Sequence, residues 1–339
     1  MRRGALLWLC LFAAFAATVG LRAGDYGDLS RPEAHVLLAA ESIVSDRDLD
    51  LRDEYGASAW RAFGGGELVP STGPRRGRLL EPTGIGFPLL VAPAYAVGGR
   101  VAVELFLAAL AALGFVIAAA LGRRLVPEPW ATRAALVSGL SPPALVASTT
   151  IAPDAVGATV LAAAAALALR VRDRPSARTA AACGALLAVL PWLAVRLLAP
   201  AAVVAAALVR WPRRRNRALA GIAGVEIVLF SLVLYASIDD RLFGGLTPDA
   251  VLPAGVSPTG AVGLGAHLER WPRLLTVWVH PTVGLLRWAP FLALAFVSLW
   301  LLWRSRRERL AVAVADQVDV EVAAAFLAAT SAASVLVAV

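Results

Sequence analysis

Lysine is absent from the chain, and charged residues of any kind are few. All 32 basic residues other than histidine are arginine, which, with the abundance of alanine, is typical of a GC-rich bacterial genome. Charged residues make up 17% and hydrophobic residues 59% of the 339 residues, and the mean hydropathy is +0.71. Soluble proteins average about 45–50% apolar residues. The composition therefore excludes a soluble globular protein and predicts an all-α polytopic membrane protein, with residues 1–339 forming a single membrane domain.

Two cysteines and three histidines are too few to suggest a disulfide or metal framework. Cys10 and Cys183 each lie in an apolar segment, where we expect small residues buried in the membrane. No spacing of His, Cys and Asp in the sequence is typical of zinc. We therefore predict no metal ligand set and no required cofactor.

Arginines occur in five short clusters that flank apolar runs. The clusters lie at residues 2–3, 123–124, 170–178, 210–217 and 304–309. This placement follows the positive-inside rule, and no basic face interleaved with aromatic residues is available to bind nucleic acid. The high pI of about 10.7 is therefore explained by arginines that set the membrane topology. We expect a multi-pass protein of the cell membrane, in contact with membrane lipids, with a cytoplasmic N-terminus and no nucleic-acid partner.

Apolar runs between the clusters predict the membrane spans. If every arginine cluster is cytoplasmic, an even number of crossings joins each neighbouring pair. The run Gly4–Leu21 exceeds the usual apolar core of a signal peptide, so we expect it to be retained as the first span. The other expected spans are Val101–Leu121, Ala131–Ile151, Asp154–Leu169, Ala218–Ile238, Val283–Trp303 and Val322–Val339. The last run ends the sequence without a polar cap, which predicts a chain shortened at its C-terminus.

Two apolar segments do not fit simple crossings. Gly84–Gly98 is short and is interrupted by Pro88 and Pro93. We expect it to lie in the outer interface or to re-enter, with a short true span as the alternative. Thr179–Val209 has arginines at both ends, which predicts two short helices that meet near Arg196.

Acidic residues concentrate in a polar loop at residues 22–82, directly after the first expected span. Eleven of the 24 acidic residues lie there. The crossing rule places this loop outside, together with a second polar loop at residues 239–282. Binding and catalytic groups tend to sit on loops that a rigid scaffold holds, so we expect the chemistry at the outer face.

Four stretches, in this order along the chain, resemble a known family of membrane enzymes. Residues 32–38 (PEAHVLL) with 46–51 (DRDLDL) are similar to its acidic first-loop motif, and residues 84–95 (GIGFPLLVAPAY) to its proline-rich interfacial segment. Residues 141–154 (SPPALVASTTIAPD) resemble its second acidic turn, and residues 190–196 (LPWLAVR) resemble its broken helix. The family is the GT-C glycosyltransferases, in particular the bacterial branch related to protein mannosyltransferases and aminoarabinose transferases. The resemblance extends over most of Asp28 to Trp303.

The resemblance implies a GT-C-like helical bundle whose large outer loop carries interfacial helices. It implies transfer of a sugar from a polyprenyl-phosphate donor to an envelope glycan, lipid or protein on the outer face. The family's first loop commonly has an Asp-Glu pair, and Pro32 stands at the first position of that pair. This leaves Glu33 or the nearby Asp28 as the general base that deprotonates the acceptor hydroxyl. A catalytically inactive relative that binds a carrier lipid or a partner is the alternative.

Each main candidate also has a structural interpretation. Glu33 is the N3 residue of a capping box that begins at Ser30, at the start of a helix expected over Pro32–Ser45. Asp154 serves as an assisting carboxylate, or it only meets the positive end of a helix dipole. Arg196, in apolar surroundings, binds the donor phosphate or extends to lipid headgroups.

Two histidines and a run of alternating aspartates are weaker candidates. His35 follows Glu33 by two residues, which directs the two side chains apart on a helix. His280 precedes a proline at a loop-to-span junction. The alternating aspartates at positions 46, 48 and 50 could attract a divalent cation, but the run lacks the glycine and terminal glutamate of an EF-hand. A solvated loop is the alternative.

Glu226 falls in the middle of an expected span, which raises a membrane transporter as a further hypothesis. A hydrogen bond to a neighbouring helix is the ordinary alternative. The sequence shows no convincing internal repeat of the kind that transporters often have.

Overall fold

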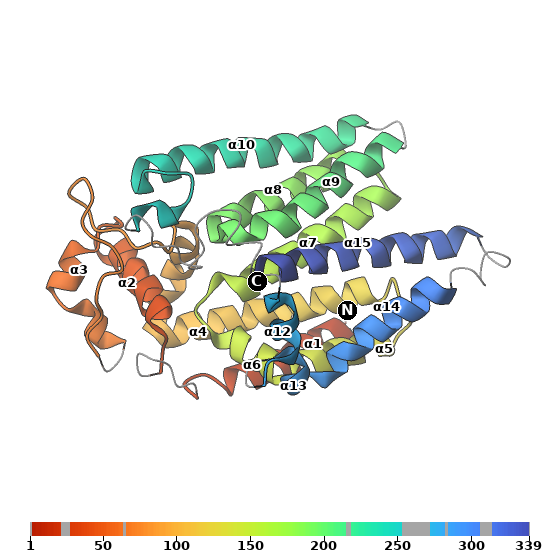
Figure 1. The fold of residues 1–339 in the computed structure, drawn as a ribbon, viewed down its shortest axis with the longest axis horizontal. Helices are drawn as coiled ribbons and strands as arrows, with labels where there is room; N and C mark the ends of the chain where they lie inside the picture. The colour runs from red at the N-terminus through yellow and green to blue at the C-terminus, as the bar shows by residue number, and fades with distance from the viewer. Residues whose placement is uncertain are drawn as a thin grey trace.

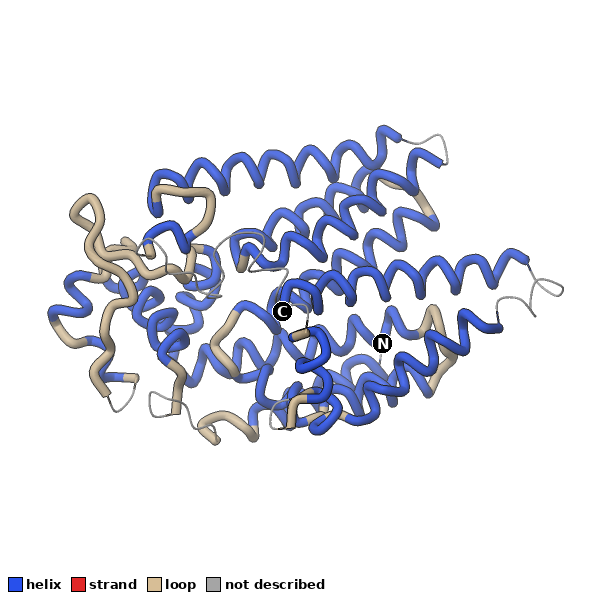
Figure 2. Tube along the Cα trace, viewed as in Figure 1, coloured by secondary structure: helices blue, strands red, loops and turns tan. Residues whose placement is uncertain are grey.

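The fold is helical throughout the described part of the chain. A computed structural model describes residues 2–21, 28–63, 66–214, 218–252, 272–281, 284–305 and 314–338. Within these ranges no strand is present (Figure 2), and an isolated bridge joins Arg75 to Arg78. The prediction of an all-α protein is confirmed.

Four helical stretches are long and apolar enough to cross a membrane. They are Gly86–Gly122, Pro153–Asp173, Val195–Pro212 and Gly221–Val251. In chain order the elements are α1 (Arg2–Ala16), α2 (Arg31–Ser45), α3 (Arg52–Gly56), η1 (Ala59–Ala62), α4 (Gly86–Gly122), α5 (Trp130–Gly139), α6 (Pro142–Thr149), α7 (Pro153–Asp173), α8 (Ala177–Leu193), η2 (Val195–Leu197), α9 (Leu198–Arg214), α10 (Ala218–Phe243), η3 (Pro248–Val251), α12 (Arg273–Val279), α13 (Leu285–Trp288), η4 (Pro290–Leu292), α14 (Ala293–Ser305) and α15 (Val314–Ala338).

The long helices lie side by side in a bundle with two chemically different ends (Figure 1). The polar segment with α2 and α3 lies at one end, on the left of the view. The C-terminal ends of α4, α7 and α9 lie at the other end, with the arginines at residues 123–124, 170–178 and 210–214. The fold therefore separates the acidic loop from these arginines along the bundle, as the positive-inside pattern requires.

The polar end has its own apolar core between α2 and α4. Leu37 on α2 packs in one cluster with Phe87, Val91 and Leu107 on α4 and with Ile151, and all five side chains are buried. Most of α2 is enclosed, because buried residues occur on every side of it from position 33 to 40. This packing places the first turn of α2 against the segment before α7.

Glycines bring α8 and α10 into close contact. A Cβ on Gly184 would collide with the backbone of Gly224, and a Cβ on Gly224 would collide with the backbone of Ala180. Small residues at helix crossings let backbones approach closely, which is a common basis of helix association in membranes.

Two of the predicted single spans are broken. Ala131–Ile151 forms α5 and α6, because Ser141 has an extended conformation (φ −68°, ψ 147°) ahead of Pro142 and Pro143. A residue before proline is disfavoured in the α region, so the helix ends there. Val283–Trp303 likewise divides into α13, η4 and α14.

The α4 helix breaks at glycines and not at the prolines on which the sequence prediction rested. Gly98 (φ −161°, ψ 27°) and Gly99 (φ 61°, ψ −147°) leave the helical region, whereas Pro93 lies inside the helix. The part of α4 after this break, residues 100–122, extends about 35 Å, which is enough to cross a hydrocarbon core of about 30 Å. The interfacial position of Gly84–Gly98 stays a prediction.

Helix ends differ from the predicted ends in two further places. The first helix ends at Ala16, before the predicted Leu21. The α10 helix continues to Phe243, so the second polar loop begins after the predicted residue 239. Part of that loop, with His267 and Glu269, lies outside the described residues. The predicted break near Arg196 is present, since Ala194 is extended (φ −166°, ψ 135°) between α8 and η2.

Candidate functional site at the polar end of the bundle

Glu33 joins the start of α2 to a distant segment. Its Oε2 accepts hydrogen bonds from the backbone N–H and the hydroxyl of Ser30, both at 2.8 Å. Its Oε1 accepts the backbone N–H of Ile151 at 2.8 Å. The predicted capping box is present. Pro32 is compatible with it, because N–H groups in the first turn of a helix have no intrahelical acceptor, so the missing N–H of proline removes no hydrogen bond. The carboxylate is buried, with Glu33 only 4% exposed.

Asp154 and Arg196 form a two-pronged ion pair between α7 and η2. Arg196 Nε donates to Asp154 Oδ1 at 3.1 Å, and Nη2 donates to Oδ2 at 2.9 Å. Both side chains are open to solvent, at 48% exposed for Arg196 and 60% for Asp154. Parallel N–H···O bonds of this kind fix the plane of the guanidinium as well as its position. The pair is therefore ordered and accessible at once.

The structure brings three of the predicted site residues to one region. Ile151, which binds Glu33, stands three residues before Asp154, and Asp154 holds Arg196. The extended backbone of Ala152 leads directly into α7, so that Asp154 lies in its first turn. Both carboxylates thus lie at helix starts, as each structural alternative predicted, and Asp154 also binds Arg196.

Near Arg196 lie further acidic and aromatic residues that the sequence analysis did not predict. Asp249 on η3 interacts electrostatically with Arg196 and with Asp239 on α10. Asp239 is fully buried near Tyr235, whose ring meets that of Trp192 edge-on at 5.3 Å between centroids. These residues come together through packing between α8 and α10, which local sequence patterns do not reveal.

An apolar groove of about 380 Å³ runs between α8, α9 and α10. Its lining includes Pro191 and Leu198, which flank the break that carries Arg196, and continues along α9 to Val209. Leu229 and Leu232 of α10 complete the wall. The apolar groove therefore begins at the break that carries Arg196 and follows α9 along the bundle.

Asp28, the other predicted base, belongs to a separate charged group. Its Oδ2 lies 3.5 Å from Nη1 of Arg100, and Arg100 Nε donates to Glu104 Oε1 at 2.8 Å. Arg100 directly follows the break in α4, and Glu104 is buried. The Asp28 side chain is mostly exposed, and its described ionic contact is with Arg100.

His35 lies in a buried polar network with Tyr55, Glu81 and Ser71. The Tyr55 hydroxyl donates to Glu81 Oε1 at 2.9 Å and lies 2.8 Å from His35 Nδ1. The Ser71 backbone N–H also donates to Glu81 Oε1, at 3.0 Å. Burial lowers the pKa of His35, although the nearby Glu81 carboxylate opposes that effect. The network connects α2 to α3 and to the loop at residues 71–81 that precedes α4.

The remaining predicted residues take no part in the Asp154–Arg196 contacts. His280 caps the C-terminus of α12, where its backbone N–H donates to Thr276 and its carbonyl accepts from Gly284. Glu226 lies within α10, and its side chain is exposed at the surface of the bundle. Neither residue is joined to Asp154 or Arg196 in the described contacts.

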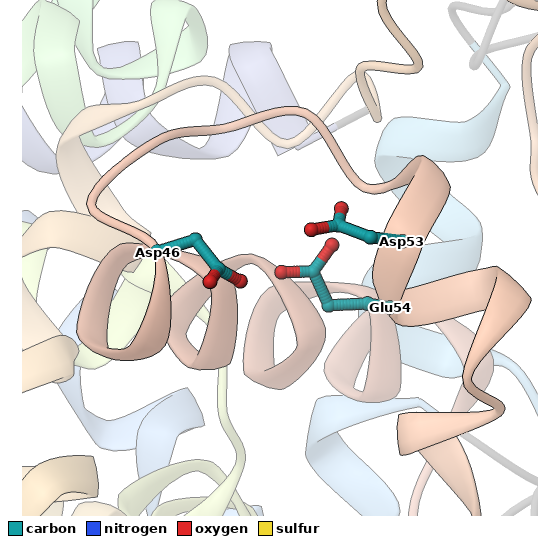
Figure 3. A group of neighbouring side chains, drawn as sticks. All are labelled: Asp46, Asp53 and Glu54. Atoms are coloured by element: carbon teal, nitrogen blue, oxygen red, sulfur yellow. The ribbon is translucent and has the colours of Figure 1, made fainter.

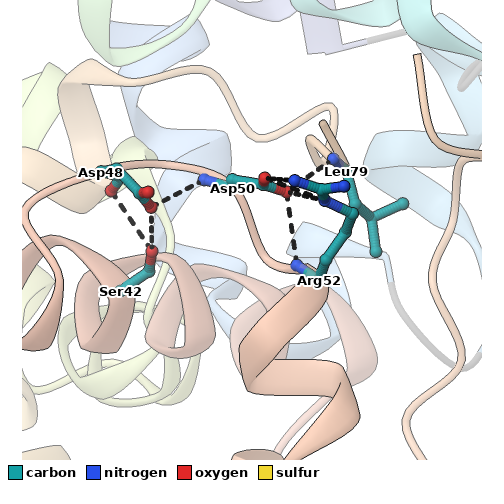
Figure 4. Close-up of polar contacts among 5 residues, drawn as sticks. All are labelled: Ser42, Asp48, Asp50, Arg52 and Leu79. Carbon is teal, nitrogen blue, oxygen red and sulfur yellow. Dashed lines mark hydrogen bonds and ion pairs between the residues drawn. The ribbon is translucent and has the colours of Figure 1, made fainter. Parts of the chain in front are cut away.

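Two of the alternating aspartates are already used in holding the loop together (Figure 4). Asp48 Oδ1 accepts from the Ser42 hydroxyl at 3.0 Å and from the backbone N–H of Asp50 at 3.0 Å. Asp50 accepts from Arg52 Nη2 at 2.7 Å and from the backbone N–H of Leu79 at 2.9 Å. The Arg52 guanidinium holds the pKa of the Asp50 carboxyl below its usual value. The third aspartate, Asp46, turns elsewhere.

No known family model, curated protein or solved structure matches this chain. The functional assignment therefore rests on the geometry of the site and on the motifs of the sequence.

Proposed function

We propose that the chain is a membrane glycosyltransferase that passes a sugar from a polyprenyl-phosphate donor to an acceptor hydroxyl at the outer face. The observation that carries the proposal is the accessible Asp154–Arg196 pair at the end of the apolar groove between α8, α9 and α10. A polyprenyl phosphate has the same division into a long apolar chain and an anionic group. The groove suits the prenyl chain, and the guanidinium of Arg196 suits the phosphate.

In this proposal, binding of the donor frees the base. The phosphate takes the two N–H groups of Arg196 that otherwise hold Asp154. Asp154 then accepts the proton of the acceptor hydroxyl while the hydroxyl oxygen bonds to the anomeric carbon. The bond between that carbon and the phosphate oxygen breaks, and the electron pair leaves with the polyprenyl phosphate, whose charge Arg196 balances. The acceptor is an envelope glycan, lipid or protein.

Glu33 has a positioning role in this scheme. Its carboxylate is buried and accepts three hydrogen bonds, one of them from Ile151 just ahead of Asp154. These contacts favour Asp154 over Glu33 and Asp28 as the group that reaches an incoming hydroxyl. The absence of an aspartate at Pro32 is then compatible with activity.

The test is sugar release from radiolabelled polyprenyl-phosphate donors by the purified protein in detergent. We expect Asp154→Asn to lower turnover by about 10²–10⁴-fold, the usual contribution of a general base. The matched control is Asp173→Asn. Asp173 also lies on α7, is partly exposed and pairs with an arginine, since it lies 2.8 Å from Arg124 at the other end of the bundle. That variant should retain wild-type turnover.

Two outcomes would count against the proposal. Equal turnover by Asp154→Asn and wild type would remove Asp154 and leave Glu33→Gln and Asp28→Asn as the next variants to assay. No turnover by the wild type with any donor, while the carrier lipid still binds, would replace the enzyme with a non-catalytic lipid-binding protein.

A further inference from the structure

Three carboxylates from α3 and from the turn after α2 converge on one point. Asp46, Asp53 and Glu54 each offer a ligand oxygen, and these oxygens lie within 4.8 Å of one another. Asp46 caps the end of α2, and the other two stand in the first turn of α3 (Figure 3). The three side chains point toward a common space, and the six residues 46–51 connect the two helices.

Glu54 adds a second observation to this grouping. Its side chain is directed at the other two carboxylates, yet the residue is only 5% exposed. Neither of its oxygens has a hydrogen-bond partner of ordinary geometry among the described residues, although Ser42 and the Asp53 carboxyl lie beside it. A buried carboxylate without a partner costs several kcal/mol unless it is protonated or bound to a cation.

The arginines of this loop do not neutralise the group. Arg52 is committed to Asp50 through contacts at 2.7–3.1 Å. Among the described residues, no ion pair joins an arginine to Asp46, Asp53 or Glu54. The neighbouring aspartates at 48 and 50 are occupied by Ser42, Arg52 and Leu79. In the described structure, the three converging carboxylates therefore form no direct ion pair with an arginine, and Asp53 has only a longer-range electrostatic interaction with Arg52.

We propose that Asp46, Asp53 and Glu54 bind one divalent cation, with Ca²⁺ as the favoured ion. The ligands are all carboxylate oxygens, which suit a hard cation and do not suit zinc or copper. Three carboxylates provide up to six oxygens, and Ca²⁺ accepts six to eight in flexible geometries with water in the remaining positions. Mg²⁺ demands a more regular octahedron, which a turn with two exposed ligands is less suited to impose.

The ion would fix the turn between α2 and α3. Arg47, inside that turn, has a left-handed backbone (φ 64°), a conformation that side-chain-bearing residues adopt uncommonly. A cation that joins the end of α2 to the start of α3 would hold this conformation from both sides. The same turn, through Arg47 and Asp48, lines a cavity of about 620 Å³ that also contacts Arg76, Arg78 and Leu242. Cation binding would thus order one wall of that cavity.

The test measures cation binding directly and does not depend on catalysis. The purified full chain in detergent is titrated with ⁴⁵Ca²⁺ by equilibrium dialysis, and thermal unfolding is followed with Ca²⁺ at about 1 mM or with a chelator. Extracellular calcium modules bind in the range of about 10⁻⁴–10⁻³ M. We expect one bound ion per chain, a higher Tm with Ca²⁺ than with the chelator, and at least tenfold weaker binding in Glu54→Gln and Asp53→Asn.

The controls separate a site from general attraction to acidic residues. Glu67→Gln removes an exposed carboxylate of the same polar loop and should bind Ca²⁺ as the wild type does. Asp46→Asn changes an exposed ligand and supplies a folded variant if Glu54→Gln does not fold. Absence of Ca²⁺ binding by the wild type, or equal binding by Asp46→Asn, Asp53→Asn and wild type, overturns the proposal. A Tm that rises equally in every variant overturns it as well.

Discussion

His35 is a buried base whose surroundings favour its neutral form. The Tyr55 hydroxyl donates to Glu81 and lies 2.8 Å from His35 Nδ1, and Nε2 faces the Ser71 hydroxyl at 3.4 Å. Burial lowers the pKa of His35 below its ordinary value of 6.5. The folded protein therefore takes up this proton less readily than the unfolded chain does.

This difference predicts an acid-dependent loss of stability. Above about pH 6.5 His35 is neutral in both states and its burial carries no protonation penalty. As the pH falls below that value, the unfolded chain binds the proton first and the free energy of unfolding decreases. We expect the wild-type Tm to fall between about pH 6.5 and pH 5, and His35→Gln to lose less over the same interval. Thermal unfolding in detergent across this range measures both slopes.

The comparison has a clear contrary outcome. Glutamine keeps a hydrogen-bonding side chain near Tyr55 and Ser71 but does not titrate, so it isolates the charge. If wild type and His35→Gln lose stability in parallel, the acid sensitivity arises from carboxylates elsewhere.

Single residues also show how far sequence reasoning reaches. The Ser30–Glu33 capping box is a local pattern of four positions, and it is present as predicted. The third donor to Glu33 comes from Ile151, 118 residues away, and no local pattern contains that information. The alternating aspartates lie in the same loop as the converging carboxylates. The three that converge are nevertheless Asp46, Asp53 and Glu54, because α3 folds back on the end of α2.

At the scale of helices, the contact between α8 and α10 depends on having no side chain at the crossing. We expect Gly184→Ala to destabilise the protein by about 1–3 kcal/mol, since its Cβ would meet the backbone of Gly224 and not a movable side chain. The measurement is the shift in Tm or in denaturant midpoint relative to wild type.

A matched glycine provides the control for that prediction. A Cβ on Gly73 would meet nothing within 4 Å, so Gly73→Ala should leave the unfolding transition within about 0.5 kcal/mol of wild type. Equal stability of Gly184→Ala and wild type would mean that the two helices separate without cost, and that the close crossing does not hold α10.

Helix positions were predicted best where polar and apolar signals coincide. The span expected at Asp154–Leu169 is α7 (Pro153–Asp173), which has Pro and Asp at its start and arginines in its last turn. The prediction of one continuous span over Ala131–Ile151 was wrong. Hydropathy alone carries no information on the conformational restriction of the residue before Pro142. The broken helix at Arg196 was predicted correctly because charge at both ends of the run required it.

At the scale of the whole molecule, the two ends of the bundle differ in charge and in content. The polar segment carries the acidic residues and meets the end of α10, where Arg75 Nη1 donates to the carbonyl of Phe243 at 2.7 Å. The opposite end holds the turn between α7 and α8, with arginines at 170–178. From these two ends we expect the bundle to lie in a membrane with the arginines on the cytoplasmic side.

Single-cysteine labelling tests this orientation. In a variant with Cys10 and Cys183 replaced by alanine, we expect a cysteine introduced by Glu67→Cys to react with a membrane-impermeant maleimide in intact cells. A cysteine introduced by Arg174→Cys should react only after the membrane is opened, because Arg174 caps α7 at the arginine end. Both positions are exposed, so burial does not account for a difference between them. The reverse labelling pattern would place the polar loop, Asp154 and Arg196 in the cytoplasm, where the proposed envelope acceptor is absent. The glycosyltransferase proposal would then be wrong because of the location alone. The Ca²⁺ site would still be tested independently by the binding measurement.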